Sequence, residues 1–482
     1  MFVGTVFVGS TRHQTVYSIT QIDPVVSFRN SQGEQVRGTI INLQRKSLVM
    51  EIYNPYSIVQ VSEVLSDLTV RMGTKNAYLG KAVVMSLVNT GLTAVVSLTL
   101  IDEWRELSDL NNEPKSVARE SAQFVSDWQT RFNIRRDYQI VVNEMRAFLS
   151  EVSRWVEQVD MTTSLPKEGE TLRMDVFEEL TAPIAQQIRH YSSQLEGEAM
   201  QVDAELAPAH RTFTQAALHP LLLRSPFVFR TYTKPLGYAG DYEMVNQILS
   251  DPRQGPTTYF QVVNATFLQS AVAAAHRNRI DLLVDFLKRM AERARERGRP
   301  MRILNVGCGP AVEINRFIAE YPDPTLLSFQ LLDFSEETLA YTKAHIDESS
   351  RKANARMEVD YVHHSVHELL KRRIAHDPSL HEFDAVYCAG LFDYLSDRVC
   401  ARLLSYFSSR TYPGGTILAT NVHINNPEKY SMEHMLEWYL IYRDEAGMES
   451  LLPDDTRDPR VYVDATGVNV FVEANVIDIA RA

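Results

Sequence analysis

A glycine turn between an apolar run and an amphipathic segment is the stretch of this 482-residue chain best suited to chemistry. The apolar run 303–306 leads into Gly307 and Gly309, and a segment with Ile314 and Phe317 follows. This pattern predicts a strand, a turn and a helix. Glycine lets the backbone turn sharply and lets a ligand approach without an intervening Cβ. The helix start would offer free N–H groups to that ligand, although many glycine turns only reverse the chain.

A second apolar run ends in an acidic residue. Leu326–Phe334 predicts the next strand, and Asp333 stands somewhat more than about 20 residues after Gly309. An acidic residue at this spacing can accept hydrogen bonds from ribose hydroxyls. The pair therefore predicts a nucleoside-containing cofactor, without saying which one. The alternative is that Asp333 caps the helix that follows.

Length and composition restrict the class of protein. A chain of 482 residues exceeds one ordinary core, so two or three domains are expected. The formal charge of −12 argues against broad binding of nucleic acid or anionic membranes. Cys308, Cys388 and Cys400 lack the spacing of a disulfide framework or a metal site. No signal peptide or long apolar run is evident, so we expect a soluble cytoplasmic protein without a bound metal.

The first 103 residues are rich in β-branched residues in short runs separated by turn residues. This predicts about seven strands in a small barrel or sandwich. Arg37–Tyr53 resembles the strand-turn-strand of PilZ domains, bacterial barrels that often bind cyclic di-guanylate through an R-x-x-x-R arm and a D/N-x-S-x-x-G turn. Here Gln44 and Ser47 replace the serine and glycine of the turn, and Arg29 lacks a partner arginine. We therefore expect a PilZ-like fold that does not bind cyclic di-guanylate. The alternative to a ligand-binding domain is a barrel used for docking or regulation.

Residues 104–224 change to a helical pattern, with apolar residues every three or four positions. This region is expected to connect the barrel to the rest of the chain. Its large aromatic side chains indicate core packing or a homodimer contact rather than a ligand site; they are Trp128, Phe132, Phe148 and Trp155.

A loop interrupts the next helical stretch. Residues 229–245 contain prolines, glycines, tyrosines and acids at a density that core helices do not need. Tyr238, Asp241 and Tyr242 in such a loop can hydrogen-bond a substrate or take its proton, so we predict a lid over a site. The alternative is a connecting Ω-loop with tyrosines packed on the surface.

From residue 302 onward, apolar runs alternate with helical patterns, which predicts a doubly wound parallel sheet. The last two runs, 460–464 and 468–474, flank the short turn Ala465-Thr466-Gly467 and should therefore pair antiparallel. A reversed last strand distinguishes the sheet of S-adenosylmethionine (SAM) methyltransferases from the all-parallel dinucleotide fold. The predicted fold class is thus multidomain: a small β-barrel, a helical region and a C-terminal α/β doubly wound, seven-stranded sheet.

On these residues, the segment 225–482 resembles class I SAM-dependent methyltransferases. The resemblance implies SAM as cofactor, and the matching positions are Asn305, Gly307, Gly309, Asp333, Phe334, Ser365, Val366 and Cys388. Two positions depart from the family pattern. Asn305 stands where Asp or Glu is common, and Ala311 replaces a third glycine.

A narrower resemblance rests on residues 233–245, 304–313 and 421–443 together. These segments are similar to bacterial methyltransferases associated with 3-hydroxypalmitic acid methyl ester biosynthesis. The resemblance implies a small-molecule or lipid-like acceptor, for example a hydroxy fatty-acid carboxylate.

Methyl transfer from a sulfonium mainly requires alignment of the reacting groups, and a hydroxyl acceptor also requires a base. The catalytic candidates are Tyr238, Asp241 and His423. Residues 433–443 could form a helix that lines a pocket, in which Arg443 would pair an acidic substrate group. The alternative is a helix that only covers the sheet. The substrate-binding candidates are Tyr242, Asp393, Glu433, Trp438, Tyr442 and Arg443.

Two other functions stay open from the sequence. In one, a degenerate methyltransferase fold senses SAM while the barrel contacts a partner. In the other, the chain is a nicotinamide-dependent oxidoreductase, which the antiparallel terminal hairpin disfavours.

Overall fold

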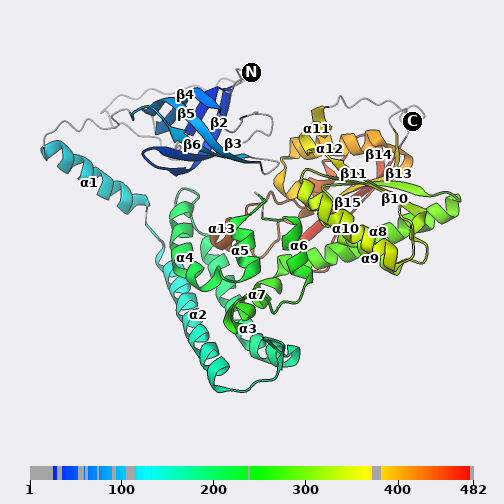
Figure 1. Cartoon of the computed structure of the whole chain (residues 1–482), viewed down its shortest axis with the longest axis horizontal. Coiled ribbons are helices and arrows are strands. Elements are labelled where there is room, and N and C mark those ends of the chain that lie inside the picture. Colours follow the sequence, from blue (N-terminus) through cyan, green and yellow to red (C-terminus); the bar gives the residue numbers. More distant parts are fainter. Residues whose placement is uncertain are drawn as a thin grey trace. The chain divides into compact units, whose positions relative to one another are not determined.

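The computed structural model describes the whole chain except residues 1–24, 30–34, 53–58, 60–62, 73–74, 90–93, 105–113, 132, 237–238, 372–380 and 478–482. The chain divides into two compact units, residues 1–121 and 122–482 (Figure 1). Each unit is described by itself.

The first unit contains a closed antiparallel β-barrel in the order β1-β2-β3-β6-β5-β4. Its described strands are β1 (Val25–Arg29), β2 (Gln35–Leu43), β3 (Ser47–Ile52), β4 (Val64–Met72), β5 (Lys75–Asn89) and β6 (Ala94–Leu100). Alternate residues such as Val26 and Phe28, or Leu48 and Met50, fill its interior. The predicted barrel is confirmed with six described strands. The runs predicted before residue 25 lie outside the described residues.

Three positions compared with PilZ domains take part in exposed hydrogen bonds of this barrel. The backbone N–H of Arg29 donates to Asp67 Oδ1 at 3.0 Å. The Ser47 hydroxyl donates to Gln44 Oε1 at 3.2 Å, across the turn between β2 and β3.

Helix α1 (Pro114–Arg131) spans the division between the units, and a helical region follows. Its elements are α2 (Arg136–Thr162), the short hairpin β7 (Lys167–Glu168) and β8 (Thr171–Leu172), α3 (Met174–Ala199), α4 (Ala207–Leu222), α5 (Pro226–Thr233), α6 (Tyr242–Leu249) and α7 (Thr258–Leu268). Residues at helical spacing, such as Val142, Met145 and Leu149, are fully buried. Trp128 and Trp155 each stay 51% exposed and are not core residues.

The loop predicted over residues 229–245 is shorter than expected, because both of its ends are helical. Helix α5 continues to Thr233, and the next residue, Lys234, adopts a left-handed conformation with φ 49° that ends the helix. Helix α6 begins at Tyr242, since the Asp241 side chain accepts a hydrogen bond from the N–H of Met244. The connection therefore covers residues 234–241.

The C-terminal part is a seven-stranded sheet in the order β11-β10-β9-β12-β13-β15-β14. Its elements are α8 (Ala271–Arg297), β9 (Met301–Val306), α9 (Val312–Glu320), η1 (Pro324–Leu326), β10 (Leu327–Asp333), α10 (Glu336–Lys352), β11 (Val359–His363), α11 (Val366–Lys371), β12 (Phe383–Cys388), η3 (Phe392–Tyr394), α12 (Asp397–Arg410), β13 (Thr411–Val422), α13 (Lys429–Leu436), α14 (Glu445–Glu449), β14 (Thr456–Val463) and β15 (Asn469–Val476). Strand β15 is antiparallel to both β13 and β14. The predicted reversed last strand and terminal hairpin are confirmed.

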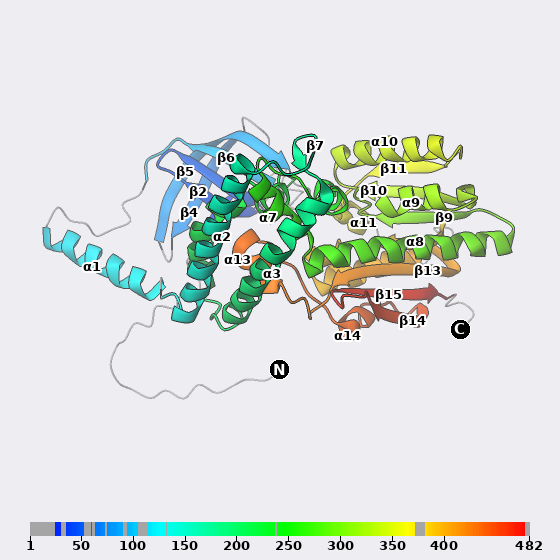
Figure 2. The same cartoon turned by 90° about the horizontal axis from the view of Figure 1, so that it is seen from below.

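Helices cover both faces of this sheet. Helices α8, α9 and α10 lie along one face, and α11 and α12 lie along the other (Figures 1 and 2). The parallel strands β9, β10, β11 and β12 end toward the helical region (Figure 2).

The chain after β13 returns to the helical region, where α13 packs against α3 and α4. Both oxygens of Glu196 accept hydrogen bonds from α13, from the N–H groups of Tyr430 (2.9 Å) and Ser431 (2.7 Å). The prediction of a helix over residues 433–443 is wrong, because α13 ends at Leu436. Glu437 takes a left-handed conformation with φ 50°, and its carbonyl accepts a hydrogen bond from Lys234 Nζ at 2.7 Å.

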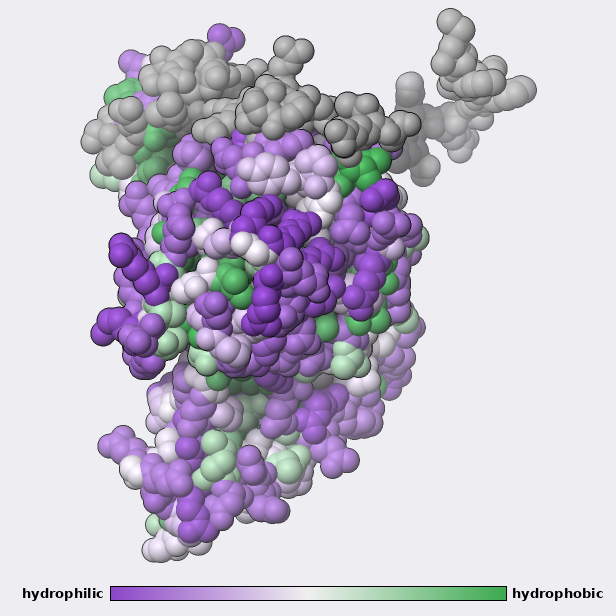
Figure 3. All heavy atoms as spheres, turned by 90° about the vertical axis from the view of Figure 1, so that its right-hand side faces the viewer, coloured by the Kyte–Doolittle hydropathy of each residue, from purple (hydrophilic) through white to green (hydrophobic). Residues whose placement is uncertain are grey.

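The face of the molecule shown in Figure 3 is mostly hydrophilic, with small separate apolar patches. In the described part of the chain, no helix has both the length and the apolar character needed to cross a membrane.

Candidate functional site

The glycine loop between β9 and α9 is held in a left-handed backbone conformation at three positions. Gly307, Gly309 and Ala311 have φ values of 70°, 51° and 48°. The N–H groups of Gly307 and Cys308 both donate to the Leu332 carbonyl, at 2.8 and 3.0 Å, which fixes the loop against β10. A Cβ on Gly309 would point into open space. The loop therefore leaves room for a ligand at this glycine.

Asp333 lies at the end of β10, next to this loop. One carboxylate oxygen accepts from the Gly309 N–H at 3.1 Å, and the other accepts from the Ser335 N–H at 3.0 Å. Asp333 is 3% exposed, and burial raises its pKa. The cap of α10 is Ser335, whose hydroxyl accepts from the Thr338 N–H, so Asp333 is not needed for that cap. Each carboxylate oxygen keeps a lone pair for a hydroxyl donor.

Three buried polar side chains, from β9, α9 and β12, form a hydrogen-bonded cluster next to the glycine loop. The Asn305 amide donates to Glu313 Oε1 at 3.1 Å and to the Tyr387 hydroxyl at 2.9 Å. The Tyr387 hydroxyl in turn donates to Glu313 Oε1 at 2.7 Å. Burial raises the pKa of Glu313, and the Tyr387 hydrogen bond lowers it. The oxygen of the Asn305 side chain has no hydrogen-bond partner among the described residues.

Arg279 of α8 brings a buried cation to the carboxyl end of β12. It is 8% exposed, and its Nη1 has no hydrogen-bond partner within the described parts of the chain. Its guanidinium lies against Gly390, where a Cβ would stand 3.0 Å from Nη1. Burial lowers the pKa of Arg279, while the carboxylates of Asp393 and Glu313 raise it. A buried cation without a hydrogen-bonded anion indicates a place for an anionic group.

Asp393 lies in the turn after β12, also at this edge. Its Oδ1 accepts from the Val422 N–H at 2.6 Å, and no described residue donates to Oδ2. Burial raises the pKa of Asp393 to about 6. The next residue, Tyr394, accepts a hydrogen bond from Trp438 Nε1 at 3.1 Å. The structure thus brings the predicted residues Asp393 and Trp438 to the same edge of the sheet.

The described part of the 234–241 connection is anchored at both ends. Asp241 is fully buried, and Arg230 Nε donates to its two oxygens at 2.8 and 3.0 Å. Together with its capping bond, this gives the Asp241 carboxylate a structural role. The Tyr242 hydroxyl donates to Glu337 of α10 at 2.7 Å, which ties α6 to the sheet helices. Tyr238 lies outside the described residues.

His423 and Arg443 are held by other protein groups. His423 Nδ1 accepts from the Asn425 N–H at 3.1 Å, so the hydrogen on Nε2 is directed at Glu445 Oε2 at 3.0 Å. Arg443 donates to Asp397, to the Asn421 side chain and to the carbonyl groups of the turn after β12. Both side chains are buried. Arg443 therefore fixes this turn, and its guanidinium has no remaining direction for a substrate group.

The other predicted positions lie near the ends of β10, β11, β12 and α13. The Phe334 carbonyl accepts from His363 Nε2 at 2.7 Å. Ser365 and Glu368 cap the start of α11 reciprocally, immediately before Val366. Cys388 is fully buried at the end of β12.

Glu433 and Tyr442 are partly buried on either side of the end of α13. Burial raises the pKa of Glu433, and Lys429 lies over the Tyr442 ring at 5.2 Å from its centre. These contacts place both residues in the helical region rather than at the glycine loop.

Comparison with known proteins leaves the family open, since no family model and no curated protein matches the chain. Among solved structures, a possible exported protein from Bordetella parapertussis matches with a TM-score of 0.40 and 14% identity, over 69% of this chain and 97% of that one. Magnesium protoporphyrin IX methyltransferase from Synechocystis, with bound S-adenosylhomocysteine, matches with a TM-score of 0.35 and 12% identity, over 52% and 98%. The N-methyltransferase NodS from Bradyrhizobium japonicum gives 0.31 and 10%, over 49% and 98%. At such TM-scores these likenesses assign no activity to this chain.

Proposed function

We propose that the chain is a SAM-dependent methyltransferase with a small-molecule or lipid-like acceptor, for example a hydroxy fatty-acid carboxylate. One observation carries the proposal: two complementary groups flank the glycine loop after β9. Asp333, hydrogen-bonded to Gly309, ends the neighbouring strand β10. Arg279, with an unpaired Nη1, lies beside Gly390 after the other neighbour, β12.

The groups of SAM fit these residues. Its ribose hydroxyls would donate to Asp333, whose oxygens each have one bond from the backbone. Its amino-acid carboxylate would pair with Arg279, whose Nη1 has no hydrogen-bond partner among the described residues. The open space at Gly309 would admit the part between these two ends. A buried guanidinium nitrogen that lacks a hydrogen-bond partner in the free protein is explained when the ligand supplies that partner.

Bound SAM supplies an electrophilic methyl group. The chain's own contribution is to hold the acceptor in line and to exclude water. Asp393, with a pKa of about 6, is ionised at neutral pH and can accept a proton from a hydroxyl acceptor. A carboxylate acceptor needs no base. Asp241 and His423 were candidates for this task, but their polar atoms are bound to Arg230, the α6 start, Asn425 and Glu445.

The engagement of Asp241 and His423 favours one second candidate, a regulator that binds SAM without transferring its methyl group. In either case we propose that residues 1–103 form a PilZ-like docking or regulatory domain and that residues 104–224 connect it to a SAM-binding part, residues 225–482. A homodimer through the helical region and a cytoplasmic location belong to the same proposal.

Calorimetric titration of the full-length protein with SAM tests the proposal. One-site binding is expected, and Asp333→Ala should weaken it by about 1–3 kcal/mol because the ribose hydroxyls lose their acceptor. Asp323→Ala, at an exposed position shortly before β10, is the matched control and should bind as wild type. Absence of binding, or equal affinity in the Asp333 variant, would refute the site.

Incubation with methyl-labelled SAM and cell-extract lipids then separates enzyme from regulator. Label in an extracted small molecule supports the enzyme. Saturable SAM binding with no labelled product from any extract supports the regulator.

A further inference from the structure

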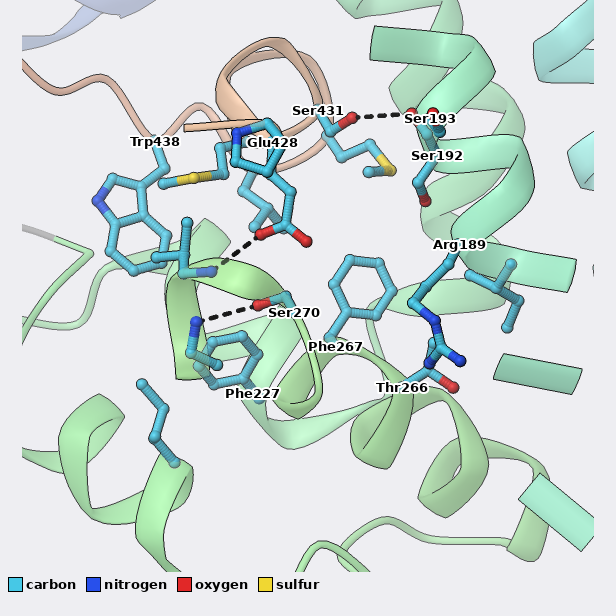
Figure 4. Close-up of a pocket in the computed structure, with 18 residues that line it drawn as sticks. Arg189, Ser192, Ser193, Phe227, Thr266, Phe267, Ser270, Glu428, Ser431 and Trp438 are labelled. Atoms are coloured by element: carbon cyan, nitrogen blue, oxygen red, sulfur yellow. Dashed lines mark hydrogen bonds between the residues drawn. The ribbon is translucent and has the colours of Figure 1, made fainter. Parts of the chain in front are cut away.

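A cavity of about 210 Å³ lies between α3 and the segment 427–438 (Figure 4). Most of its lining is apolar, and polar groups along it have partners within the protein. Both oxygens of Glu428 accept from the first N–H groups of α8, those of Ala271 and Val272, at 3.1 Å each. The Ser431 hydroxyl donates to the Ser192 carbonyl at 3.3 Å. These groups therefore offer little that would select a ligand.

A larger hollow, of about 760 Å³, lies between β11 and the C-terminal half of α10. Strand β11 is an end strand of the seven-stranded sheet and lies beside α10 (Figure 2). Met357, Val359 and Tyr361 line the hollow, and because they alternate along the chain they face the same side. The residues between them, Glu358 and Asp360, are exposed. No residue proposed to bind the cofactor lines this hollow, so it is a separate site.

The backbone of β11 has one side without partners. The Glu358 carbonyl accepts from the Phe329 N–H of β10 at 2.9 Å. In a parallel pair the residues bonded to the neighbouring strand alternate, so the N–H and C=O groups of Val359 and Tyr361 point away from β10. No described residue forms a hydrogen bond with these four groups. They are placed to pair with a further extended segment.

The opposite end strand, β14, is built differently. Pro459 has no N–H, Asp458 takes a left-handed conformation with φ 53°, and the pairing with β15 shifts between Arg457 and Arg460. Proline, charged side chains and a bulge are features that keep a sheet edge from pairing with another chain. Strand β11 contains no proline, and its pairing with β10 has no shift. One edge of the sheet is thus protected, and the other is able to pair.

The hollow beside β11 is lined by more cations than anions, in a chain with a formal charge of −12. Its charged side chains are Lys343, Arg351, Arg356 and the carboxylate of Asp347. Lys343 pairs with Asp347 at 3.3 Å, and Arg351 Nε donates to the Asp347 carbonyl at 3.3 Å. Among the described residues, no carboxylate pairs with Arg351 or Arg356. Both guanidinium groups can therefore receive acidic side chains.

Tyr361 adds a hydrogen-bond donor to this wall. Its hydroxyl is buried and has no partner in the described part of the chain, and Lys343 Nζ lies 5.2 Å from the centre of its ring. Burial raises the pKa of the Tyr361 hydroxyl, so it stays protonated at neutral pH. A carboxylate in the hollow would supply the missing acceptor.

We propose that β11 and the hollow beside it form a docking site for an extended acidic peptide segment of a partner protein. The backbone of the segment pairs with Val359 and Tyr361, and its acidic side chains, at alternate positions, reach Arg351, Arg356 and the Tyr361 hydroxyl. A second copy of this chain is a poorer occupant, because two-fold pairing of β11 strands would bring the same cations together. The site is apart from the glycine loop, so the inference does not depend on the proposed function.

Fluorescence anisotropy of a labelled heptapeptide that alternates valine and glutamate, titrated with the full-length protein, tests the docking site. A heptapeptide that alternates valine and lysine has the same preference for extended structure with the opposite charge, and it should not bind. Two further versions of the glutamate peptide carry N-methyl groups, one on its valines and one on its glutamates. Only one of these sets can face β11 in a paired strand, so one version should lose binding and the other should keep it.

Variants of the protein test the two parts of the site separately. Arg351→Glu combined with Arg356→Glu should weaken binding of the glutamate peptide at least about tenfold, whereas Arg398→Glu, at an exposed position of α12, should not change it. Val359→Pro removes an outward N–H and no bond to β10, and it should weaken binding to a similar extent. Val359→Thr keeps this N–H and is its control.

Three results would overturn the inference: no saturable binding of the glutamate peptide, equal binding of the glutamate and lysine peptides, or equal binding of the two methylated versions. The last result, with binding lost only on charge reversal, would indicate an anion site without strand pairing. Dimerisation of the protein that Val359→Pro abolishes would assign the edge to a second copy instead. Titration of the same variants with S-adenosylhomocysteine should give equal affinities, which keeps failure of the docking site distinct from failure of the proposed function.

Discussion

Replacing Arg279 with methionine should weaken binding of the amino-acid end of the proposed cofactor and leave binding of its nucleoside end unchanged. Arg279 has no hydrogen-bonded anion among the described residues, and burial lowers its pKa more than the nearby carboxylates raise it. The free protein therefore gains little from this charge, and Arg279→Met should leave the free energy of unfolding within about 1 kcal/mol of the wild type or increase it. The affinity for S-adenosylhomocysteine, which carries an amino-acid carboxylate, should instead decrease in Arg279→Met.

Coulomb's law gives the expected size of the binding loss for a carboxylate in contact with Arg279. A carboxylate about 4 Å from the guanidinium, at an effective dielectric constant of about 20, contributes about 4 kcal/mol. Truncation of one partner of a desolvated charge pair costs about 2–5 kcal/mol, so the affinity for S-adenosylhomocysteine should fall roughly 30-fold or more.

Calorimetry with two ligands gives the decisive comparison. 5′-Methylthioadenosine has the same nucleoside and thioether but no amino-acid group, so its affinity should be equal in wild type and Arg279→Met. Arg289→Met removes an arginine from the same helix, where it pairs with Glu473 at 2.8 Å, and controls for general effects on α8. If both ligands weakened equally, or if S-adenosylhomocysteine bound unchanged, Arg279 would not hold the carboxylate.

Two further predictions rest on buried carboxylates of the structure, and a third rests on the sequence alone. Burial raises the pKa of Asp393 from 3.8 to about 6. The protonated carboxyl therefore contributes to stability fully below pH 3.8, and this contribution is lost as the pH rises through about 6. Urea unfolding between these pH values should show the loss in the wild type and less of it in Asp393→Asn. Asp241→Ala should lower the free energy of unfolding, measured with urea, by about 3 kcal/mol, because a helix cap is lost and Arg230 is left unpaired. The control Asp175→Ala removes an exposed ion pair and should cost less than about 1 kcal/mol. Similar losses in the two variants would contradict a stabilising role of the buried Arg230–Asp241 pair. Tyr238→Phe should lower turnover more than SAM affinity, and full turnover would make this tyrosine structural only.

The parts of the site that the sequence predicts are those built from neighbouring residues. Residues 303–333 form strand, glycine turn, helix and strand in sequence order, so the contact between Gly309 and Asp333 follows from two adjacent β-α units. The terminal hairpin is predictable for the same reason, because a short turn forces the two strands to pair.

The remaining parts depend on contacts between distant segments. The helix after Lys429 ends at Leu436 where Lys234, 203 residues before Glu437, binds the Glu437 carbonyl. Helix α8 contains several arginines, and only the packing of the helix on the sheet shows that Arg279 is the one turned inward. The sequence suggested His423 as a base and Arg443 as a substrate contact, because their partners Glu445 and Asp397 could not be identified without the fold.

The Asn305–Glu313 pair couples two positions that are far apart in the strand-turn-helix segment. Position 305 at the end of β9 carries an amide, and a carboxylate reaches it from Glu313, eight residues later. Asn305→Asp alone would place two carboxylates side by side and should be destabilising, whereas the double exchange Asn305→Asp with Glu313→Gln should restore stability. Residues 305 and 313 therefore act as one unit: a change at either position is expected to be tolerated only together with a compensating change at the other.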